Sequence, residues 1–157
     1  MNKNKLLNTG SILMLIGALS FIGYAIVFFF RSFSGQGFEL GAETLNGVTP
    51  AQLNAINPAI VAYITHVHVA VSGFIAGTGI AVAALAWYGV RKGMWWAWTA
   101  AVASPVAALA VALPLHYLGG FDYDWIAHLG PIYLGTVIFV IGALMALKGL
   151  MQQRSSA

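Results

Sequence analysis

The chain has 157 residues, of which 60% are hydrophobic and 7% are charged. In soluble domains roughly a quarter of the residues are charged. This composition therefore excludes an ordinary soluble domain and predicts a membrane protein. The chain contains no cysteine, which excludes disulfides, thiolate metal sites and iron–sulfur clusters.

Four apolar stretches are long enough to cross a bilayer, for which a helix needs about 20 residues. They run from Asn8 to Phe30, from Pro58 to Tyr88, from Met94 to Leu118 and from Trp125 to Leu147. Lys3 and Lys5 precede the first stretch as in a secretion signal, but its apolar run is longer and no small-residue cleavage pattern follows. We therefore predict an all-α membrane protein, a four-transmembrane-helix bundle in which residues 1–157 form one domain.

The connection between the first two stretches contains a predicted helix of its own. In the sequence GVTPAQLNAINP, Thr49 is a candidate N-cap, Pro50 takes the first helical position and Gln52 completes a capping box. Leu53 and Ile56 fall on one side of this helix. We predict a short amphipathic helix at the bilayer surface, which either covers a pocket as a lid or only connects two spans.

Charged side chains give the bundle an orientation. Basic residues occupy the N-terminus, the second connection and the C-terminus, at Lys3, Lys5, Arg91, Lys92, Lys148 and Arg154. By the positive-inside rule these segments are cytoplasmic, so both termini are predicted to face the cytoplasm from a cell (plasma) membrane. The outer side receives residues 31–57 and 119–124, which hold all four acidic residues. The net charge of +3 follows from this topology, and nucleic acid is not an expected partner.

All four histidines are predicted to lie at one depth, near the outer boundary of the hydrocarbon. Counting about 20 residues outward from Trp87, Trp96 and Leu147, which mark the inner boundary, reaches positions 67, 116 and 127. These positions match the histidines, which are His66, His68, His116 and His128. Ionisable residues in spans are candidates for function, although a histidine at the boundary can also reach water and serve none.

His66 and His68 cannot both face the bundle axis, because they are separated by about 200° around an ideal helix. His68 shares a polar face with Ser72, whereas His66 lies along Gly73 and Gly77, whose GxxxG spacing suits close helix packing. We predict that His68 points inward and that His66 contacts another helix or subunit.

Local chemistry near the other two histidines favours a pocket. Asp124 and His128 are four residues apart, so the carboxylate could orient the imidazole or join it in binding a metal. Capping of the helix N-terminus is the simpler role for Asp124. Pro114 and Pro131 lie close to His116 and His128, and bends at matching depths would open space between the helices.

Two classes of function follow. In the first, His68, His116 and His128 bind haem b or a transition metal such as copper or zinc, with Asp124 as a further metal ligand or outer-shell partner, in a redox or metal-handling role. In the second, the protein has no cofactor and is a non-catalytic accessory subunit of a larger membrane complex. An enzyme that uses a histidine and Asp124 as acid and base stays open, and no catalytic residue can be named.

The predicted partners are the lipid bilayer and other membrane proteins. The chain has little soluble mass and its helices are rich in glycine and alanine, so we expect a homo-oligomer or a membrane-protein complex. A secondary transporter is disfavoured, because a chain with four spans would have to oligomerise and charged residues are absent from the spans.

Overall fold

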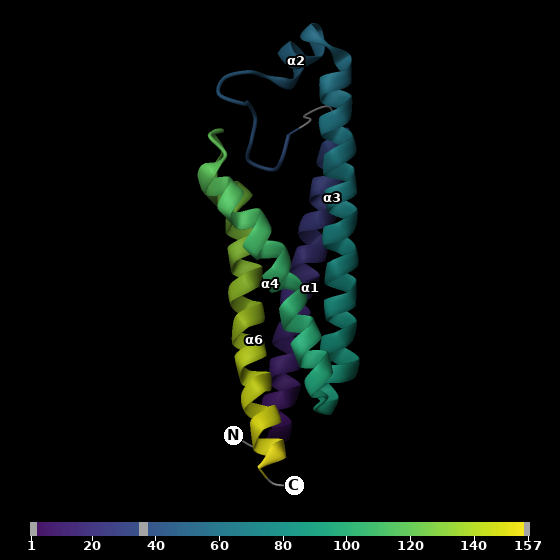
Figure 1. The fold of residues 1–157 in the computed structure, drawn as a ribbon, viewed down its shortest axis with the longest axis vertical. Coiled ribbons are helices and arrows are strands. Elements are labelled where there is room, and N and C mark those ends of the chain that lie inside the picture. Colours follow the sequence, from purple (N-terminus) through teal and green to yellow (C-terminus); the bar gives the residue numbers. More distant parts are fainter. Residues whose placement is uncertain (1–2, 35–37, 156–157) are drawn as a thin grey trace.

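The computed structural model describes residues 3–34 and 38–155, and helices make up most of this part. They follow in the order α1 (Lys3–Phe33), α2 (Pro50–Ile56), α3 (Pro58–Ala84), α4 (Trp95–Leu118), α5 (Trp125–His128) and α6 (Gly130–Arg154) (Figure 1). A π-helical turn, η1 (Leu85–Gly89), and a 3-10 turn, η2 (Val90–Lys92), connect α3 to α4. Within the described residues, α1, α3, α4 and α6 are the four helices that are long and apolar enough to cross a membrane.

The two ends of the bundle differ in what they carry. The N- and C-termini lie together at one end, which we call the terminal end (Figure 1). The connection from α1 to α3, with α2, lies at the opposite end, which we call the loop end. α4 begins near α3 at the terminal end and reaches α6 at the loop end, so it crosses the bundle obliquely (Figure 1).

α1 and α6 are in backbone contact through glycines spaced seven residues apart. A Cβ atom on Gly142 would lie 2.6 Å from the Met14 nitrogen and 2.7 Å from the Gly10 oxygen. Seven residues are nearly two helical turns, so such glycines share one face and let two helices approach closely. By contrast, a Cβ atom on Gly73 or Gly77 would meet nothing within 4 Å. The GxxxG of α3 is therefore not used for packing among the described residues.

The apolar core lies toward the terminal end, where all four long helices meet. Its buried members are Met14, Ala18, Val82, Ala86, Val90, Ala97, Ala101, Phe139, Ala143 and Ala146. The indole nitrogen of Trp98 donates a hydrogen bond to the Ala143 oxygen at 3.0 Å and so ties α4 to α6. Small residues bring the helices together here, and the obliquity of α4 leaves more space toward the loop end.

The fourth predicted span is divided in the structure. We predicted one stretch from Trp125 to Leu147, but α5 ends at His128 and α6 begins at Gly130. Pro131 has no N–H for the carbonyl one turn earlier, and this accounts for an interruption at Leu129. The break places His128 at the end of a separate short helix.

The short helix α2 carries the capping box that its sequence indicates. The Thr49 nitrogen donates to Gln52 Oε1 at 2.8 Å, and the Gln52 nitrogen donates to Thr49 Oγ1 at 3.3 Å. α2 has no buried residue and lies at the extremity of the loop end (Figure 1). No residue of α2 lines the cavity described below, whereas Glu39, in the segment before α2, does.

Candidate metal centre

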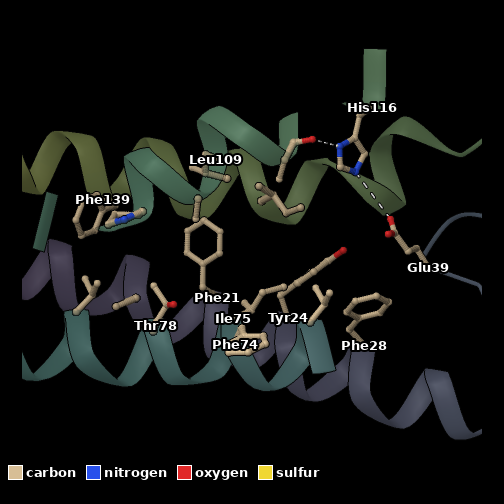
Figure 2. A pocket seen from close by; sticks show the side chains of 18 residues that line it. Phe21, Tyr24, Phe28, Glu39, Phe74, Ile75, Thr78, Leu109, His116 and Phe139 are labelled. Atoms are coloured by element: carbon tan, nitrogen blue, oxygen red, sulfur yellow. Dashed lines mark hydrogen bonds and ion pairs between the residues drawn. The ribbon is translucent and has the colours of Figure 1, made fainter. Parts of the chain in front are cut away.

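Three of the four histidines surround one carboxylate at the loop end. Oε2 of Glu39 lies 3.0 Å from His128 Nε2 and 3.8 Å from His116 Nε2, and its Oε1 lies 3.9 Å from His68 Nε2. We call these four residues the Glu–His cluster. One donor atom each from Glu39, His116 and His128 lies within 4.8 Å of the others, a grouping that could hold a metal ion. Figure 2 shows the His116–Glu39 side of this arrangement.

Glu39 reaches the centre because its loop is fastened to the connection between α4 and α6. His128 Nδ1 donates to the Leu40 oxygen, and the Asp124 nitrogen donates to the Gly41 oxygen at 2.8 Å. Gly41 has a φ of +82°, and a Cβ atom there would lie 3.0 Å from the Asp124 oxygen. A glycine is needed at this point for both its left-handed backbone and its close approach to α5.

Backbone carbonyls set the orientation of two imidazole rings. His128 Nδ1 bonds the Leu40 oxygen, and His116 Nδ1 bonds the Ala112 oxygen at 2.9 Å. A carbonyl only accepts hydrogen bonds, so both Nδ1 atoms carry the proton and both Nε2 atoms are turned toward Glu39. This is how outer-shell carbonyls present metal-binding histidines.

Aromatic rings pack against the imidazoles of the Glu–His cluster. The Tyr123 ring centroid is 4.8 Å from that of His128, and the Phe28 ring centroid is 5.0 Å from that of His68. The Tyr123 hydroxyl also donates to the His116 oxygen at 3.0 Å. The His128 side chain is fully buried, whereas those of His68 and His116 are each 16% exposed and that of Glu39 is 33% exposed. The rings limit side-chain movement and leave the carboxylate partly accessible.

Glu39 and His128 stabilise each other's charged forms, and both lie outside the four long helices. Burial alone would raise the pKa of Glu39, but the His128 hydrogen bond and the charges of His128, His68 and His116 together lower it. Burial alone would lower the pKa of His128, but its bonds to Glu39 and to the Leu40 carbonyl, with the Glu39 charge, raise it.

The structure separates the predicted site residues into two groups. His68, His116 and His128 face one another around Glu39, and His66 is exposed on the outer side of α3. Asp124 is apart from this arrangement, because its Oδ1 accepts bonds from the Ile126 and Ala127 nitrogens at 2.8 and 2.9 Å. Asp124 thus has the capping role, the simpler of the two considered.

Glu39, which was not among the predicted site residues, takes the central position between the three histidines. Asp124 was predicted as a further metal ligand or an outer-shell partner. The sequence places Glu39 in the outer connection but contains no spacing that relates it to a histidine. Its location depends on how residues 38–48 fold back, and the only local signal is Gly41 two residues later. A loop contact of this kind cannot be read from helical periodicity.

A cavity of about 340 Å³ extends from the Glu–His cluster into the bundle. It lies between α4 on one side and α1 and α3 on the other (Figure 2). Glu39 and His116 stand at its loop end, and Phe139 stands at its deep end (Figure 2). Most of its remaining lining is aliphatic or aromatic. The cluster is therefore open to an apolar interior.

No known protein-family model, curated protein or solved structure matches this chain. The class of site is defined by its donor atoms, which are two imidazole nitrogens and a carboxylate oxygen with a third imidazole beside them. Imidazole with carboxylate is a donor set found for zinc and for other divalent transition metals. The cluster is accordingly a candidate centre for such an ion.

Proposed function

We propose that this is an integral membrane protein that binds one divalent transition metal ion, zinc or copper, through Glu39, His116 and His128. The observation that carries the proposal is the meeting of three donor atoms within 4.8 Å, each from a different segment of the chain. The fixed Nδ1 protons of both histidines add to it, because they leave Nε2 as the ligand atom on each ring. A metal-handling role is the function that this geometry supports best.

His68 has a different part in the proposed site. Its Nε2 lies closest to Oε1 of Glu39, whereas His116 and His128 both lie closest to Oε2. We assign His68 to the orientation of the carboxylate and leave the fourth metal position to water or to a ligand. Three protein ligands with one open position are typical of zinc sites that bind or transform a further molecule.

A compact ion fits the donor geometry better than haem b. A haem held by two imidazoles needs these nitrogens on opposite faces of a wide macrocycle. Here His116 Nε2 and His128 Nε2 approach the same carboxylate oxygen, and the two ring centroids are 4.8 Å apart. A porphyrin could not fit between these two rings unless the rings moved apart.

The proposal places the metal on the outer side of a plasma membrane, with both termini in the cytoplasm. Support comes from the basic residues near the terminal end and from the acidic residues at the loop end. The natural chain has no cysteine, so single cysteines at Glu43 and Ser155 report the orientation. An impermeant thiol reagent should label Glu43→Cys but not Ser155→Cys in intact cells, and the reverse pattern would overturn the orientation.

Metal binding is tested on protein reconstituted in phosphatidylcholine nanodiscs. Wild type should hold about one equivalent of zinc or copper, measured by elemental analysis after removal of loosely bound ions. His116→Ala and Glu39→Gln should lose the ion, since each removes one of three ligands, and the matched control His66→Ala should retain it. Metal-free wild type, or equal loss in His66→Ala, would contradict the proposal.

A second proposal, assembly with another copy or a larger membrane complex, is supported by α3. Its Gly73 and Gly77 are exposed and a side chain there would meet nothing within 4 Å. A second helix could approach closely along this face. Replacement of both glycines by isoleucine should then reduce the size of the native species, and an unchanged size would exclude this face as a contact.

A further inference from the structure

The cavity beside the Glu–His cluster is long and narrow. On α1 its lining extends from Ala18 to Phe28, which is about 15 Å along a helix that rises 1.5 Å per residue. Spread over that length, a volume of about 340 Å³ corresponds to a cross-section of roughly 20 Å², close to a single file of methylene groups in van der Waals contact with the walls. The length and volume of the cavity match those of one extended hydrocarbon chain.

The polarity of the cavity changes along its length. Phe139 and Val82 line its deep end and are both almost fully buried. At the loop end the lining includes Glu39 and His116, and Tyr24 points its hydroxyl toward them (Figure 2). An occupant with one apolar tail and one polar head would match both ends at once.

The cavity is open at its side. Phe74 lines it and is 78% exposed, and Val71 beside it is also exposed. If α3 and α4 cross a membrane, this opening faces the hydrocarbon rather than water. An occupant would enter from the bilayer, which again favours a lipid over a water-soluble molecule.

We propose that the cavity binds a single-chain lipid whose head carries an oxygen donor, a carboxylate or a hydroxyl, with the chain between α1, α3 and α4. The head lies at Glu39 and His116, where its oxygen takes the open position of the bound metal ion. This second part rests on the proposed metal-binding function. At about 1.2 Å per bond of an extended chain, the cavity accommodates roughly twelve carbons.

The position of the chain is tested with dodecanoate that carries a photoreactive diazirine at its last carbon. The probe is added to wild type in phosphatidylcholine nanodiscs, irradiated and located by mass spectrometry. We expect cross-links at the deep end, on peptides that contain Val82 or Phe139. Cross-links spread evenly over the exposed faces of the helices would show ordinary bilayer contact and would overturn the proposal.

Two alanines of α4 provide a matched pair of variants. Both are exposed, but Ala108 lines the cavity and its neighbour Ala107 does not. Ala108→Phe fills the cavity and should lower deep-end labelling at least about tenfold, equivalent to 1.4 kcal/mol of binding free energy. Ala107→Phe adds the same ring elsewhere and should label as wild type. Equal labelling of the two variants would overturn the assignment of the chain to this cavity.

The link to the metal is measured separately. Zinc content without lipid tests the proposed function alone, and deep-end labelling without zinc tests the chain cavity alone. In protein that binds zinc, zinc should raise dodecanoate labelling severalfold, and Glu39→Gln, which removes a proposed metal ligand, should abolish that rise. Zinc-bound protein that shows no rise would overturn the placement of the head at the metal.

Discussion

Nε2 of His128 lies 3.0 Å from Oε2 of Glu39, and Nδ1 of the same ring bonds the carbonyl of Leu40. One buried imidazole therefore contacts the side chain of one loop residue and the backbone of the next. The position of the loop and the geometry of the candidate ligands are consequently fixed by the same contacts. Changes in the loop should affect metal affinity, and loss of the Glu39 carboxylate should affect stability.

The Glu39–His128 pair should give the metal-free protein a stability that depends on pH. The pKa of Glu39 is lowered from 4.5, so its contribution is complete above that value and is lost as pH falls through the lowered pKa. The pKa of His128 is raised from 6.5, so its contribution is complete below that value and is lost as pH rises through the raised pKa. The melting temperature of wild type minus that of Glu39→Gln, measured with a chelator, should be largest between pH 4.5 and 6.5. A difference that does not vary with pH would contradict the pairing.

If docking of the loop positions Glu39, zinc affinity should fall when Gly41 is replaced by alanine but not when Gly47 is. Both have positive φ, of +82° and +87°, so alanine is strained to a similar extent at each. Only at Gly41 would the added Cβ meet α5, whereas at Gly47 it meets nothing within 4 Å. We expect zinc affinity to fall about 10- to 100-fold in Gly41→Ala, the range for outer-shell changes, and to stay near wild type in Gly47→Ala. Similar affinities in the two variants would show that docking does not position Glu39.

The amide variants of Asp124 and Glu39 should differ in zinc binding. Asparagine still caps a helix, so Asp124→Asn should retain α5 and bind zinc as wild type does. Glu39→Gln should lose the ion, because the amide is a much poorer ligand for a divalent metal. Zinc titration of both proteins decides the matter. A loss in Asp124→Asn as large as that in Glu39→Gln would restore Asp124 as a ligand.

The α1–α6 contact should tolerate no side chain at Gly142. An added Cβ would lie 2.6 Å from a backbone nitrogen of α1, so Gly142→Ala should destabilise the protein by about 1–3 kcal/mol, as overpacking does. Gly77→Ala is the control, because its Cβ meets open space and alanine favours helix by up to about 1 kcal/mol. Reversible unfolding in mixed micelles measures both. Equal effects would argue against backbone contact between the two helices.

Helical periodicity and bilayer thickness were sufficient to predict the four long helices and the end of the bundle at which the histidines lie. The same reasoning predicted which face of α3 points inward, since His68 faces the interior and His66 does not. Glu39 was placed only as a polar residue of the loop, because its contact with His128 depends on tertiary docking. The packing glycines were sought at Gly73 and Gly77, although the backbone contact is between α1 and α6. A local spacing shows that close packing is possible but does not show which helix is the partner.

The distribution of the candidate ligands along the chain sets an order of events during biosynthesis. Glu39 is synthesised soon after α1 and His116 near the end of α4. His128 follows at the end of α5, just before the last helix. The carbonyl of Leu40 has no imidazole to accept from until α5 is in place. If the proposed site binds an ion, its capture would follow insertion of the last helix, and a truncated chain that ends before α5 would retain no metal. The centre would then mark chains that have completed their insertion.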